Sequence, residues 1–90
     1  MRDLSDVTVR PSDFETLAQL CANDADFPID FEGWQVMLLT AQRDAITRHF
    51  YPAPLLLDVR EFAAWCERLR VTPCLDALRA FVIIKRREVS

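Results

Sequence analysis

Ninety residues are enough for one domain and too few for two. The chain is 51% hydrophobic and carries a formal net charge of −3, which argues against a nucleic-acid partner because neutralising phosphates requires a basic surface. No apolar run approaches the roughly 20 residues of a membrane-spanning helix. Polar residues also follow the first methionine directly, so we expect a cytoplasmic protein without a membrane partner.

The first ten residues show no sustained hydrophobic period, so we expect residues 1–10 to form an irregular N-terminal arm. The run from Val7 to Val9 would form a short strand only if another strand paired with it. Apolar residues recur at helical spacing further along the chain, which predicts a single helical domain over residues 11–87.

A capping motif marks the start of the first helix. Ser12 and Glu15 have the spacing of a capping box, in which the two side chains satisfy free backbone N–H groups. Apolar residues then recur at helical spacing as far as Cys21, which predicts a helix over residues 13–22. The segment 23–28 follows as a loop, because asparagine, aspartate and proline favour turns.

The longest helix is expected over residues 30–50. Asp30 is suited to cap this helix, and Pro52 stops it because proline cannot donate a helical backbone hydrogen bond. The apolar residues expected on its core-facing stripe are Phe31, Trp34, Leu38, Ala41 and Ala45, widened by Met37, Ile46 and Phe50. A helix of this length would form the spine of the fold.

Two shorter helices should follow. Asp58 is a second suitable cap, and the apolar stripe after it predicts a helix over residues 58–70. Thr72 and Pro73 combine a cap with a proline at the first helical position, which predicts a helix over residues 73–86.

These four segments define the expected fold class as all-α, a small bundle of about four helices. The last segment leaves one alternative open. Its run from Phe81 to Ile84 is rich in β-branched residues, so a small α+β fold with a short C-terminal strand near residues 81–85 is also consistent with the sequence.

The helices expected over residues 30–50 and 73–86 are apolar on more than one side, and such helices must be covered on every side. A chain of this length has few elements with which to cover them. We therefore expect these segments to bind a protein partner, either a second copy in a homodimer or another protein. The candidate interface residues are Val36, Met37, Leu39, Phe81, Ile83 and Ile84.

The charge is distributed unevenly. Residues 1–33 hold eight acidic and two basic residues and carry −6, whereas residues 34–90 hold nine basic and six acidic residues and carry +3. An acidic front can dock on a basic back, within one chain or between two. Ten arginines against one lysine are typical of a GC-rich, bacterial genome.

No metal or cofactor site is expected. His49 is the single histidine, and Cys21, Cys66 and Cys74 are an odd number without a close pair, so we interpret them as reduced, apolar thiols. The acidic segment 24–32 lacks the glycine and glutamate of an EF-hand, and its carboxylates should cap the helix expected over residues 30–50 and face water. We expect a non-enzymatic protein, because the sequence offers no assignable nucleophile–base pair and no paired acids in an apolar setting.

The sequence thus favours a protein–protein interaction or adaptor domain that forms a homodimer through apolar helical faces. The alternative is a helix-turn-helix-like DNA-binding regulator that uses residues 58–86, where two helices flank a short turn. Asp76 lies near the start of the second helix and would repel phosphate, which favours an ordinary helical hairpin.

Overall fold

The computed structural model describes the backbone of residues 2–89 and the side chains of residues 3–88. Helices dominate this part of the chain and confirm the predicted small helical bundle: α1 (Pro11–Leu20), α2 (Phe31–Thr47), α3 (Val59–Leu69) and α4 (Leu75–Val89). A short 3-10 helix, η1 (Arg2–Leu4), and two strands, β1 (Val7–Thr8) and β2 (Leu55–Leu56), accompany them. Within this range, no helix has the length and apolar character needed to cross a membrane.

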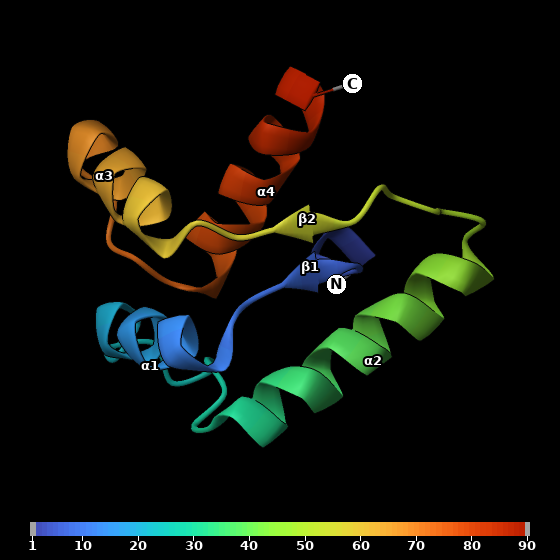
Figure 1. The fold of residues 1–90 in the computed structure, drawn as a ribbon, viewed down its shortest axis with the longest axis horizontal. Helices are drawn as coiled ribbons and strands as arrows, with labels where there is room; N and C mark the ends of the chain where they lie inside the picture. Colours follow the sequence, from blue (N-terminus) through green and yellow to red (C-terminus); the bar gives the residue numbers. More distant parts are fainter. Residues whose placement is uncertain (1, 90) are drawn as a thin grey trace.

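The two strands form a small parallel sheet whose register pairs Val7 with Leu55 and Thr8 with Leu56. The N–H of Leu55 donates to the carbonyl of Asp6 at 2.9 Å, and the N–H of Leu57 donates to the carbonyl of Thr8 at 2.8 Å. β1 leads into α1 and β2 leads into α3 (Figure 1). Both helices therefore start at the carboxyl end of the sheet.

Residues 2–8 differ from the irregular N-terminal arm expected over residues 1–10, because they form η1 and β1 and place Leu4 and Val7 in the core. η1 packs against both α2 and α4, and Leu4 is fully buried. The guanidinium of Arg86 donates to the carbonyls of Asp3 and Ser5, and Nη2 of Arg79 lies 3.0 Å from Oδ2 of Asp3. The acidic N-terminal part thus docks on the basic C-terminal part within one chain.

Two of the expected helix caps are confirmed. The Asp30 carboxylate accepts a hydrogen bond from the N–H of Gly33 at 2.8 Å at the start of α2. The Asp58 carboxylate accepts from the N–H groups of Arg60 and Glu61, at 3.0 and 3.2 Å, at the start of α3. Each aspartate satisfies backbone donors that have no partner within the helix.

The other two helices begin differently from the prediction. α1 starts at Pro11, and its N-cap is Arg10, which makes no side-chain capping hydrogen bond. The capping box centred on Ser12 is therefore wrong: proline at the first helical position already fixes the helical backbone there. α4 starts at Leu75, whose N–H donates to Oδ2 of Asp24 at 2.8 Å. The cap of α4 thus comes from the loop after α1 and not from Thr72.

Residues 81–85 lie inside α4, so the alternative of a C-terminal strand is wrong. Leu78, Phe81 and Val82 are all buried and share one face of this helix. Burial of that face outweighs the strand preference of the β-branched residues, since β propensity depends strongly on the packing context.

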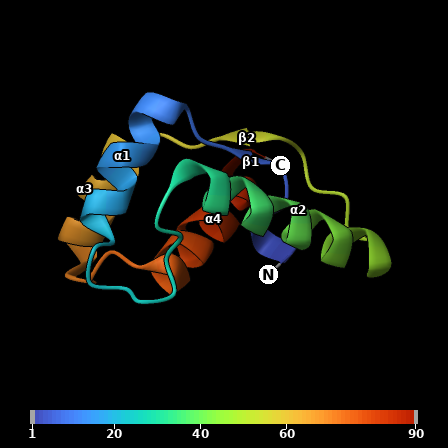
Figure 2. The same cartoon turned by 90° about the horizontal axis from the view of Figure 1, so that it is seen from below.

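The core contains two aromatic clusters. Phe14 lies within ring contact of Phe27, Phe31 and Trp34, with centroid separations of 5.7 to 6.1 Å. The second cluster joins Phe62, Trp65 and Phe81 of α3 and α4. Figure 2 shows α1 beside α3 at one end of the molecule, while the C-terminal end of α2 extends to the opposite end.

Candidate functional site

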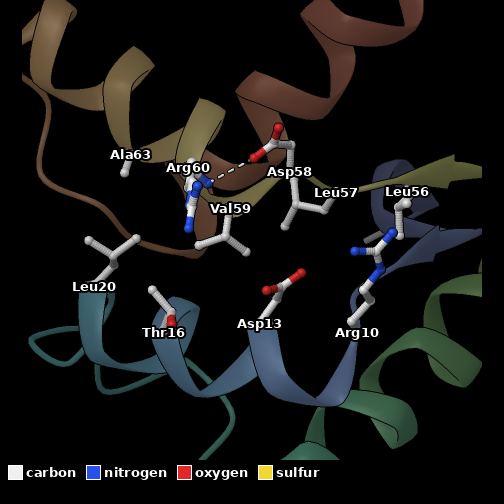
Figure 3. Close-up of a pocket in the computed structure, with 10 residues that line it drawn as sticks. All are labelled: Arg10, Asp13, Thr16, Leu20, Leu56, Leu57, Asp58, Val59, Arg60 and Ala63. Atoms are coloured by element: carbon white, nitrogen blue, oxygen red, sulfur yellow. Dashed lines mark hydrogen bonds between the residues drawn. The ribbon is translucent and has the colours of Figure 1, made fainter.

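A groove of about 550 Å³ lies between α1 and α3. It lies where β1 and β2 lead into these two helices, and Figure 3 shows the helices as its two walls. The lining residues are Arg10, Asp13, Thr16, Leu20, Leu56, Leu57, Asp58, Val59, Arg60 and Ala63.

Charged side chains of both signs face this groove. Arg10 and Asp13 come from the α1 wall and Arg60 from the α3 wall, and these three side chains form no ion pair with one another (Figure 3). The Asp58 carboxylate is already engaged with the first N–H groups of α3. The groove is therefore a polar, open depression with separated charges, and no cysteine or histidine lines it.

The cysteines lie elsewhere and two of them are unsuited to nucleophilic chemistry. Cys21 and Cys66 are buried, whereas Cys74 is half-buried. Burial raises the pKa of the Cys21 thiol to about 12, and burial likewise raises the pKa of Cys66. Both thiols therefore stay protonated at neutral pH, and the thiolate is the nucleophilic form. His49 is exposed beyond the end of α2.

Among the side chains of residues 3–88, no three histidine, cysteine or acidic groups come together in a way that could hold a metal ion. In the acidic loop before α2, carboxylates accept hydrogen bonds from backbone N–H groups. Oδ1 of Asp24 accepts from the N–H of Asp26 at 2.9 Å, and Asp30 caps α2. Asp30 thus caps the helix that the sequence indicated for these acids, whereas Asp24 caps α4 instead.

Acidic side chains lie beside the start of α4, where a recognition helix would meet DNA. A hollow of about 300 Å³ at the start of α4 is lined by Asp24, Asp26 and Asp76, among other residues. Further along α4, Arg79 contacts Asp3 at 3.0 Å, and Nζ of Lys85 lies 2.5 Å from Oε1 of Glu61. Several basic groups of α4 are thus engaged within the protein.

The six candidate interface residues are distributed over different environments. Val36 and Leu39 of α2 are 57% and 56% exposed, and Ile84 of α4 is 38% exposed. Met37 and Ile83 are half-buried, and Phe81 is 3% exposed and belongs to the core. Among the six candidates, the more exposed residues are therefore on α2, and α4 contributes less than expected.

One further residue extends the exposed surface of α2. Ile46 was expected on the core-facing stripe, but it is 51% exposed. At about 100° per residue, its direction lies close to those of Val36 and Leu39. We define the outer face of α2 as Glu32, Val36, Leu39, Arg43 and Ile46, all of which are exposed. A helical-wheel projection centred on the buried Trp34, Ala41 and Ala45 could have placed Ile46 there.

Comparison with known protein families, characterised proteins and solved structures finds no match to this chain.

Proposed function

We propose that this chain is a non-enzymatic protein–protein interaction domain that forms a homodimer through the outer face of α2. The observation that carries this proposal is the row of aliphatic side chains at Val36, Leu39 and Ile46, each more than half exposed. The opposite face of the same helix is fully committed to the core through Trp34 and Ala41. The outer face thus offers apolar area that the core does not require.

The energetic reason is the transfer of these side chains out of water. Fully burying a valine, leucine or isoleucine stabilises by about 1.5 to 3 kcal/mol, so a half-exposed side chain gains roughly 1 kcal/mol when a partner covers it. Three such residues on each of two copies supply a substantial driving force for association. An exposed apolar patch on a small protein is a common mark of an interaction surface.

The alternative of a DNA-binding regulator has weaker support. A recognition helix should present polar and basic groups to the DNA at its start, but Asp24 and Asp76 surround the start of α4. Three free cysteines are compatible with a reducing compartment, which supports our proposal of a cytoplasmic location.

The proposal is tested by light scattering on a dilution series from high to low micromolar protein. We expect the wild type to change from dimer to monomer, and Val36→Glu/Leu39→Glu to remain a monomer throughout. The matched control is Leu69→Glu/Val71→Glu, which places the same charges on exposed apolar residues outside α2. A wild type that stays monomeric at high micromolar concentration would refute the proposed homodimer.

A further inference from the structure

The outer face of α2 carries charges as well as apolar groups, in a defined order. Steps of four, three, four and three residues separate Glu32, Val36, Leu39, Arg43 and Ile46. At about 100° per residue these five side chains fall within an arc of roughly 80°. Ile29, just before the helix, is 97% exposed. The face therefore runs from an acidic end to a basic end with aliphatic residues between and beyond the two charges.

The order is symmetric about the midpoint between residues 37 and 38. Val36 and Leu39 lie equally far from this midpoint, at about 2 Å along the helix axis. Glu32 and Arg43 lie about 8 Å from it on opposite sides. Val36 on one side of the midpoint therefore corresponds to the apolar Leu39 on the other side, and the acidic Glu32 corresponds to the basic Arg43. A two-fold axis through this midpoint makes the face complementary to itself.

We propose that α2 pairs antiparallel with α2 of a second copy about this axis, which rests on the homodimer proposed above. Val36 then meets Leu39 of the partner subunit, and Glu32 forms an ion pair with Arg43 of the partner subunit. Two-fold symmetry repeats each contact, as an isologous interface requires. A shallow crossing angle of about 20° allows such contacts along several turns of the helix pair.

The two charges of the outer face are available for this pairing. Neither Glu32 nor Arg43 forms an ion pair among the residues whose side chains the structure describes. Elsewhere on α2, Arg48 pairs with Asp44 at 3.0 Å within its own helix. The free acid and base are therefore those that the symmetry places opposite each other.

Charge also sets the direction of the pairing. A parallel arrangement would place Glu32 against Glu32 and Arg43 against Arg43. Because like charges in contact repel each other, the parallel arrangement is disfavoured. Because charge pairs at an interface contribute mainly orientation and register, the aliphatic residues supply most of the affinity. The face thus combines attraction from its apolar groups with a direction defined by its charges.

Charge reversal tests the arrangement directly. In a homodimer of the Glu32→Arg variant, both contacts between positions 32 and 43 bring two arginines together. In a homodimer of the Arg43→Glu variant, both of these contacts bring two glutamates together. We expect either single variant to dimerise about tenfold more weakly than the wild type at low salt. An equimolar mixture of the two variants should form a heterodimer, because both cross-contacts are then attractive. Glu32→Arg/Arg43→Glu should form a homodimer like the wild type.

The measurement is sedimentation velocity for the affinities and native mass spectrometry for the composition of the mixed dimer. Raising the salt to about 1 M shortens the screening length to about 3 Å, so the difference between single variants and wild type should narrow. Glu15→Arg and Arg68→Glu are matched controls, since they make the same changes at exposed positions on α1 and α3. Thermal melting verifies that each variant is folded.

The outcomes are distinct. Preferential heterodimer formation between the single variants, absent from the control pair, supports the antiparallel register. If the single variants dimerise as tightly as the wild type, the antiparallel register is wrong while the homodimer stands. The same conclusion follows if mixing the two single variants does not restore the affinity of the dimer. A monomeric wild type overturns both proposals. Should one reversal impair folding, Glu32→Gln and Arg43→Gln remove the charges without repulsion and should weaken the dimer to a smaller extent.

Discussion

Asp24 caps α4 from a distant part of the chain: its Oδ2 lies 2.8 Å from the backbone nitrogen of Leu75, 51 positions further along the sequence. The same carboxylate accepts from the N–H of Asp26 through Oδ1. A negative charge at this position also favours the positive end of the helix dipole. One side chain thus joins the loop after α1 to the start of α4.

This contact leads to the first prediction. Asp24→Ala should lower the free energy of unfolding by about 1 to 2 kcal/mol, because it removes a helix cap and leaves the Leu75 N–H in a partly buried position without its partner. Asp24→Asn should lose less, since its amide oxygen can still accept the hydrogen bond. Urea denaturation monitored by circular dichroism measures both changes.

The control for this prediction is Asp76→Ala, which removes an exposed acid from the same helix turn. It should change stability by less than Asp24→Ala. Equal losses for the two variants would indicate that general charge at the start of α4, and not the hydrogen bond, carries the effect.

The second prediction concerns the N-terminal segment. Leu4 is fully buried between α2 and α4, so Leu4→Ala should destabilise the protein by about 2 to 5 kcal/mol through lost burial and the cavity left behind. Leu56→Ala makes the same change at a residue that is 53% exposed and should have a much smaller effect. Chemical denaturation of both variants provides the comparison, and a small effect of Leu4→Ala would contradict the core position of η1.

The third prediction is a loss of stability in alkaline solution. Burial raises the pKa of Cys21 from 9.0 to about 12, so above pH 9 the unfolded chain loses this proton while the folded chain keeps it. Stability linked to this thiol is complete below pH 9 and decreases as the pH rises toward 12. Cys21→Ala should flatten this dependence, which urea denaturation at pH 8 and pH 10.5 would detect. Cys74→Ala, at a half-buried site, is the matched control.

The helices could be predicted because their signals are local. Apolar spacing identified all four helical segments, and Asp30 and Asp58 each act within a few residues of their own position. The error at α1 also has a local cause: Pro11 takes the first helical position, ahead of the Ser12 capping box that the sequence suggested. Helix existence is thus encoded within short windows of this sequence.

The sheet and the N-terminal packing could not be predicted in this way. β1 is two residues long, and its partner β2 lies more than 40 residues away. Strands of this length have no periodic pattern, and their stability depends on neighbours that only the tertiary structure supplies. The hydrogen bonds that the Arg86 guanidinium donates to the carbonyls of Asp3 and Ser5 likewise join residues that are far apart in the sequence.

The candidate surface was predicted in part. The apolar excess of α2 pointed to Val36 and Leu39, which are exposed. The same reasoning selected Phe81, which is buried, because composition alone does not tell which side of α4 faces the core. Ile46 was assigned to the core stripe because its helical position lies at the edge of that stripe and widens it. A helical-wheel projection could have corrected Ile46, whereas the burial of Phe81 depends on which side of α4 the neighbouring elements cover.

The position of the N-terminal segment determines when the protein can finish folding during synthesis. Leu4 and Val7 are synthesised well before β2 and α4, the elements that pack against this segment. At about 5 to 20 residues per second, these aliphatic side chains wait several seconds without their native neighbours. The nascent chain therefore exposes these aliphatic side chains to water until α4 becomes available to cover them.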